Sequence, residues 1–109
     1  MKRPNIGALR HRIEIRKDSR ESDHAGGLVE SEPKTIACVW AKIDGLHGRE
    51  FWQAQQVSAE VTHRVTMRYL DGISRDQYVW YQGRRLDIVY ILNVGEKNAY
   101  LELMTTERP

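Results

Sequence analysis

The segment at residues 61–70, VTHRVTMRYL, alternates strictly between two kinds of side chain. The odd positions hold Val61, His63, Val65, Met67 and Tyr69. The even positions hold Thr62, Arg64, Thr66 and Arg68. Successive side chains of a β-strand point to opposite faces, so a period of two predicts a strand with one face turned to a core. A helix would spread the same apolar residues around its circumference, so this pattern strongly constrains the fold.

Two segments nearer the start of the chain also have the character of strands. Residues 9–17, LRHRIEIRK, repeat the alternation and predict a half-buried strand with a charged outer face. Residues 35–43, TIACVWAKI, are apolar on both parities, as in a central strand that is covered on both sides. We therefore expect Cys38 to be a small buried hydrophobe, since free cysteine is among the most buried residue types.

Turn sequences divide the rest of the chain into hairpins. Asp71-Gly72 ends the alternating segment, and Gln82-Gly83 suits a tight hairpin because glycine adopts positive φ easily. The sequence GEKN at residues 95–98 forms a further connection. The strands predicted between these turns are QYVWY at 77–81, RRLDIVYILNV at 84–94 and AYLELMT at 99–105.

Residues 49–61, REFWQAQQVSAEV, predict one short helix. Phe51, Ala54, Val57 and Val61 have helix-compatible spacings, and alanine and glutamine favour that state. Phe51 and Trp52 cannot both face the same core, because neighbouring residues of a helix lie about 100° apart. One of the two is therefore a candidate partner contact.

The polar segment at residues 18–33, DSRESDHAGGLVESEP, predicts a loop that is functional or mobile.

At 109 residues, the whole chain, 1–109, has the length of a single domain. Successive hairpins in so small a unit tend to close, since an open sheet leaves adhesive edges. The expected fold is mainly β: a small antiparallel β-barrel of about six strands with one short inserted α-helix.

Few features of the sequence suggest chemistry. Glu60 and His63 form an E-x-x-H pattern, but two metal ligands of that kind need a continuous helix, and period-two alternation already begins at Val61. We instead expect Glu60 to end the helix and His63 to be a hydrogen-bonded residue of the next strand. Cys38 lacks the surroundings of a nucleophile. The expectation is a protein without catalytic residues, metal or cofactor.

The cellular compartment can also be anticipated. The one cysteine excludes an internal disulfide and favours a reducing compartment. No apolar run approaches the roughly 20 residues of a membrane-spanning helix, and the first residues lack the apolar core of a signal peptide. We expect a soluble protein that is made in the cytoplasm and has no membrane partner.

A small OB-like barrel that binds single-stranded nucleic acid is the alternative function. Its candidate bases are Arg10, Arg12, Arg16, Arg64 and Arg68, and its candidate stacking residues are Trp40, Trp52, Tyr69 and Trp80. Against it, Glu14, Asp71 and Asp87 interrupt the bases, and the formal net charge is only +2. A nucleic-acid-binding protein normally has a clustered basic stripe.

The order of several short motifs resembles the head-tail joining, or head-closure, proteins of tailed bacteriophages. The resemblance covers nearly the whole chain and rests on Leu9-Arg10-His11-Arg12-Ile13, Val39-Trp40-Ala41, Gly48-Arg49-Glu50, Ala54-Gln55, Ala59-Glu60, Thr62-His63, Met67-Arg68-Tyr69, Ile73, Tyr81-Gln82-Gly83-Arg84 and Leu101-Glu102-Leu103. Each motif alone is weak, and their order and spacing together are specific.

The resemblance implies a non-enzymatic virion component of the head-tail connector, assembled in the cytoplasm of a bacterial host. Such a protein docks as a ring, dodecameric like the portal, beneath the portal and its adaptor. The ring closes the DNA-filled head, contacts packaged double-stranded DNA non-specifically and offers a surface to a tail-completion protein. An isolated subunit of this kind can be monomeric. In some relatives the segment between the second and third strands lines or plugs the channel, and here it corresponds to residues 44–60.

The predicted contact residues follow from that correspondence. The candidates for subunit, partner or channel contacts are Arg49, Glu50, Phe51, Trp52, Gln53, Gln55 and Gln56. We expect Phe51 or Val57 to hold the insertion against the barrel, and Arg49 and Glu50 to be free for contacts between subunits or with the channel. A second contact loop at residues 18–33 contains His24, Gly26 and Gly27.

Overall fold

The computed structural model describes residues 9–22 and 28–108. Its elements, in chain order, are β1 (His11–Ser22), β2 (Leu28–Gly45), α1 (Gly48–Val57), β3 (His63–Arg68), β4 (Gln77–Tyr81), β5 (Arg84–Asn93), the 3-10 turn η2 (Val94–Glu96) and β6 (Tyr100–Arg108). The prediction of a mainly β protein with one short helix is confirmed. Among these elements, no helix has the length and apolar character needed to cross a membrane.

The six strands form a closed antiparallel barrel in the order β1-β2-β3-β6-β5-β4, with β4 pairing back to β1. The alternation that predicted β3 points Val65 and Met67 into the barrel, where both are fully buried. Val65 lies opposite Leu103 on β6, and Met67 lies opposite Ala41 on β2, so the inward residues of neighbouring strands meet in one core. The predicted barrel is therefore confirmed.

The turn between β4 and β5 fixes their register. Gln82 and Gly83 both have positive φ, at 49° and 79°, as a two-residue turn of the I′ type requires. Tyr81 and Arg84 are therefore directly opposite each other across the hairpin. This register points Val79 and Leu86 into the core together.

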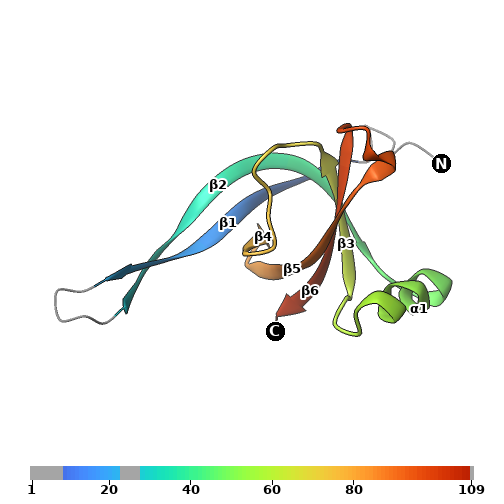
Figure 1. Ribbon diagram of the computed structural model, residues 1–109, viewed down its shortest axis with the longest axis horizontal. Helices are drawn as coiled ribbons and strands as arrows, with labels where there is room; N and C mark the ends of the chain where they lie inside the picture. Colours follow the sequence, from blue (N-terminus) through green and yellow to red (C-terminus); the bar gives the residue numbers. More distant parts are fainter. Residues whose placement is uncertain (1–8, 23–27, 109) are drawn as a thin grey trace.

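The predicted loop at residues 18–33 is wrong over most of its length. The register from Ser19↔Ser31 to Ser22↔Leu28 continues β1 and β2 into a two-stranded ribbon that extends beyond the barrel (Figure 1). The ribbon has no third strand, because β4 leaves β1 at Lys17. A pair of strands that extends beyond the barrel has no core to cover, so its sequence does not need the apolar alternation of a barrel strand. The predicted contact residues His24, Gly26 and Gly27 lie outside the described residues.

The prediction that residues 35–43 are covered on both sides is also wrong. Ala37, Val39 and Ala41 face the barrel interior, but Ile36 is 40% exposed and Trp40 is 54% exposed on the outer face. Cys38 is exposed as well, and is not the buried hydrophobe expected. Residues 9–22 and 28–108 thus leave the outer face of this wall uncovered.

The ribbon and α1 lie at opposite ends of the long axis (Figure 1). The molecule measures 53 × 27 × 27 Å, so its length is about twice its width. A closed barrel with two projections can touch different neighbours at its two ends.

Replacing Leu103 by alanine tests the core. Leu103 is fully buried at the centre of the barrel, so Leu103→Ala should lower the free energy of unfolding by about 2–5 kcal/mol through lost burial and a residual cavity. Leu92 lies on the same sheet but is exposed, so Leu92→Ala should change the free energy of unfolding by less than about 1 kcal/mol. Urea denaturation measures both values. Equal effects of the two substitutions would contradict the assigned inner and outer faces.

Candidate functional site

Helix α1 is joined to the barrel by a small apolar cluster. Ala54 is the one residue buried in α1, and it packs with Val61 before β3 and Met104 of β6. Leu46 and Tyr90 border this cluster. The expected anchor Val57 is not an anchor, because it is 70% exposed. Val57 is the last residue of α1, and the buried contact of the helix lies one turn earlier, at Ala54.

Hydrogen bonds fix both ends of the insertion at the same place on the barrel. The amide Nε2 of Gln55 donates to the carbonyl oxygen of Val61 at 2.8 Å. The backbone N–H of Leu46, before the helix, donates to the carbonyl of Thr62, after it, at 3.0 Å. Gln55 was a predicted partner contact, but its side chain is hydrogen-bonded within the chain. The insertion leaves and rejoins the barrel at adjacent points.

Arg64 connects the helix to the barrel wall electrostatically. Its guanidinium lies 3.4 Å from a carboxylate oxygen of Glu50, and 3.7 Å from oxygens of both Asp44 and Glu102. The expectation that Glu50 is free is therefore wrong, since it pairs with a residue fourteen positions away. Each such pair is worth little at a surface, but three carboxylates around one guanidinium restrict the pose of α1.

The other face of α1 is exposed. Arg49, Trp52, Gln53 and Gln56 follow the spacing i, i+3, i+4 and i+7, which aligns them along one side of the helix, and all four are exposed. We call this set the α1 stripe. Trp52 is 69% exposed and touches the half-buried Phe51 edge to face, with ring centroids 5.8 Å apart. Of the two aromatic residues, Trp52 is thus the one available to a partner.

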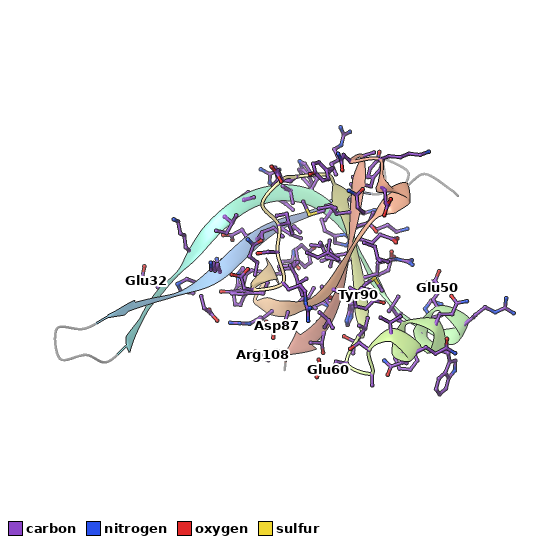
Figure 2. The ribbon with its side chains drawn as sticks, in the orientation of Figure 1. Glu32, Glu50, Glu60, Asp87, Tyr90 and Arg108 are labelled. Atoms are coloured by element: carbon purple, nitrogen blue, oxygen red, sulfur yellow. The ribbon has the colours of Figure 1, made fainter. Side chains whose placement is uncertain are left out.

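Figure 2 shows Glu50 on α1 and Glu32 on the ribbon, far apart in the molecule.

Glu60 and His63 do not form a joint site on a helix. Glu60 is exposed in the turn that follows α1, whereas His63 begins β3. The Nδ1 atom of His63 lies 2.9 Å from the hydroxyl oxygen of Thr62, and the backbone carbonyl of His63 accepts a hydrogen bond from Thr105 Oγ1 at 3.0 Å. These contacts make His63 part of the sheet entrance, as its strand prediction implied.

The arginines and aromatic residues of the outer wall contact one another. The guanidinium of Arg12 lies 5.3 Å from the ring centre of Trp40, and that of Arg16 lies 4.7 Å from the ring centre of Trp80. Arg16 also binds Glu14 at 3.1 Å, which holds the pKa of that carboxyl below its usual value. Four of the residues that a nucleic acid would use, Arg12, Arg16, Trp40 and Trp80, are therefore paired with one another within the chain.

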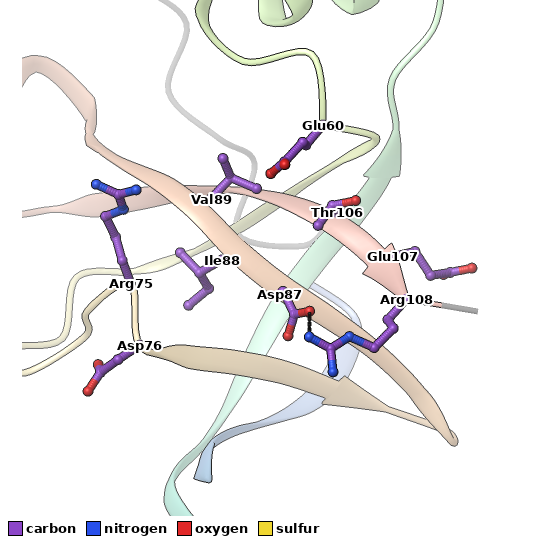
Figure 3. A pocket seen from close by; sticks show the side chains of 9 residues that line it. All are labelled: Glu60, Arg75, Asp76, Asp87, Ile88, Val89, Thr106, Glu107 and Arg108. Atoms are coloured by element: carbon purple, nitrogen blue, oxygen red, sulfur yellow. Dashed lines mark ion pairs between the residues drawn. The ribbon is translucent and has the colours of Figure 1, made fainter.

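A broad groove of about 810 Å³ opens beside the turn that follows α1, along β5 and β6 (Figure 3). The residues that line it are Glu60, Arg75, Asp76, Asp87, Ile88, Val89, Thr106, Glu107 and Arg108. Arg108 pairs with Asp87 at 2.9 Å across its floor. Its walls come from segments that are distant in sequence, so the sequence alone did not indicate it.

Comparison with known proteins decides the family. The family model described as "Phage head completion protein" matches residues 4–108. The chain belongs to the phage head completion protein family.

Two solved structures share the fold of this head completion family member. Protein SF1141 from Shigella flexneri 2a superposes with a TM-score of 0.74 at 24% identity, over 95% of this chain and 96% of that one. A chain from the virion of a native gene transfer agent particle has a TM-score of 0.62 at 16% identity, over 97% and 98% of the two chains. No curated protein matches the sequence.

Family membership confirms the resemblance seen in the sequence motifs. The chain is a structural protein of the phage head and therefore belongs to the virion. For a head completion protein the relevant surfaces are those that meet neighbours. The structure brings most of the predicted contact residues together on α1, although Glu50 and Gln55 face the barrel.

Removing the guanidinium of Arg64 tests how the pose of α1 is held. Arg64→Met leaves Glu50, Asp44 and Glu102 without their common partner, so hydrogen exchange of α1 amides should accelerate roughly fivefold, equivalent to about 1 kcal/mol. Barrel amides should be unaffected. Lys42→Met, which removes only a pair with Asp44, is the control. Unchanged exchange in α1 would mean that Ala54 and Gln55 hold the helix without Arg64.

Proposed function

We propose that this head completion protein docks as a ring beneath the portal or its adaptor, closes the DNA-filled head and presents a surface for tail attachment. The observation that carries the proposal is the α1 arm, which projects from a closed barrel and exposes Trp52. Exposed aromatic residues on a projecting element are typical anchors of protein interfaces.

A ring suits the mechanical task. Packaged DNA presses outward, and one subunit contact is too weak to resist it, so many identical contacts must act together. A subunit that binds its neighbour through two different patches closes into a ring when the rotation between copies is right. We propose a dodecamer, which matches the symmetry of the portal, and a monomer or small assembly before the portal complex provides a template.

The barrel and the arm have different parts in this proposal. The barrel is a stable wall, whose closed sheet leaves α1 as the projecting part of the insertion at residues 44–60. Arg49 is exposed near the start of α1, where it can meet a neighbouring subunit or the phosphates of DNA in the channel. Contacts to phosphates are independent of base sequence, as a channel protein requires.

Substitutions on the α1 stripe test the proposal. Arg49→Glu and Trp52→Ala should each leave the subunit folded, because both side chains are exposed, and should lower the plating of a phage that depends on this chain by at least roughly tenfold. Electron microscopy should show filled heads without tails, and nuclease treatment should detect leaked DNA. Lys97→Ala, exposed in the connection between β5 and β6, is the control. Normal plating of both stripe variants would refute the role of α1.

Deleting residues 48–53 is a stronger change of the same segment. The deletion removes most of the α1 stripe but retains Ala54 and the barrel strands, so circular dichroism should still show a β protein. Heads should fill with DNA and then fail to retain it or to join tails. A variant phage that plates like the wild type would show that closure uses another surface.

A further inference from the structure

The α1 stripe has the pattern of a helix that fits into a groove. Its four residues repeat at i, i+3, i+4 and i+7, the spacing with which amphipathic helices place anchors in a partner. Trp52 is the large anchor at its centre, and Arg49 supplies one positive charge at its start. The last turn of α1 has no basic residue, so its carbonyl end keeps the partial negative charge of a helix terminus.

The groove of Figure 3 has the complementary features. Val89 offers a half-buried apolar side chain on the outer side of β5, whereas its neighbour Ile88 is buried in the barrel core. The groove volume of about 810 Å³ can admit a large aromatic side chain. Thr106 adds a small polar wall. The groove lies on the outer side of β5 and β6, where a helix of another molecule can approach it.

Most charges around the groove are paired within the chain. Asp87 binds Arg108 at 2.9 Å, Glu107 accepts from Arg84 Nε at 2.7 Å, and Asp76 binds Lys17 at 3.0 Å. Two lining charges, Glu60 and Arg75, make no ion pair with any residue whose side chain the structure describes, that is, within 9–18 and 32–108. They come from separate walls of the groove (Figure 3). Within that part of the chain, the groove therefore offers one unpaired negative and one unpaired positive charge.

We propose that the α1 stripe of one copy binds in the β5–β6 groove of the next copy. Trp52 packs against Val89, Arg49 pairs with Glu60, and the carbonyl end of the helix faces Arg75. The opposite direction of the helix would bring Arg49 to Arg75 and is disfavoured by repulsion. The proposal rests on the ring assembly proposed above and names the surfaces that form it.

The partner is a second copy because both halves of the contact exist on this chain and cannot meet within it. The Arg64 contacts and the packing of Ala54 hold the other face of α1 on its own barrel, so the stripe points away. Joining one patch to a different patch on the next copy is a heterologous contact, which propagates around a ring. A contact of like with like would stop at a dimer.

Exchanging charges provides the first test. Arg49→Glu and Glu60→Arg should each reduce incorporation of the protein into head particles by at least roughly tenfold, and the double variant should recover to within about threefold of the wild type. Both side chains are exposed, so the variants should fold, as circular dichroism can verify. Glu96→Arg, an exposed acid on the connection after β5, should be neutral. Normal incorporation of Glu60→Arg, or no recovery in the double variant, would overturn the pairing and leave ring docking intact.

Cross-linking supplies the second test. Gln53→Cys and Thr106→Cys are combined in a Cys38→Ser background, and head particles are treated with a short bismaleimide. Heterologous contacts should produce a ladder of trimers and larger species on denaturing gels, and neither single cysteine should do so. A dimer band alone, a product with another virion protein, or no product in particles that contain the chain would each contradict the proposal. Absence of the chain from particles would instead count against the proposed function itself.

Discussion

The pairing of β4 with β1 is the interaction on which the rest of the structure depends. Four residue pairs, from Glu14↔Trp80 to Lys17↔Gln77, convert a six-stranded sheet into a barrel. Without them two long strand edges would be open to other chains, and the inward side chains would lack an enclosed core. Closure also fixes where β1 and β2 continue alone, because their ribbon begins beyond Lys17, the last residue of β1 that pairs with β4. The position of the ribbon therefore follows from this closure.

The joint between α1 and the barrel is smaller than the core and is built differently. The barrel is held by ladders of backbone hydrogen bonds and a continuous apolar interior, whereas the arm depends on Ala54, one amide hydrogen bond from Gln55 and the contacts of Arg64. Elements with few buried contacts open at lower free energy than the core. A head completion protein can therefore keep a rigid wall while its arm adapts to a neighbour.

The sequence predicted the parts of the fold that local pattern controls. Two-residue alternation identified β3, and Gln82-Gly83 identified the hairpin of β4 and β5, since both signals depend on adjacent residues. The ribbon was missed because its sequence is polar, and polarity alone does not distinguish a strand that lies outside the core from a loop. The pair between Glu50 and Arg64 and the groove beside Glu60 were missed because they arise when distant segments meet. The order of the motifs indicated the family. All four residues of the α1 stripe were among the predicted contact residues.

The outer wall of the barrel has a practical consequence for work with the purified protein. Cys38 is the single cysteine of the chain, and its side chain is exposed on β2, on a face that neither the α1 stripe nor the β5–β6 groove uses. Oxidising storage would couple molecules back to back through this thiol, in an arrangement unrelated to assembly. Under reducing conditions the same thiol accepts one fluorophore per subunit, which makes subunits countable in single virions.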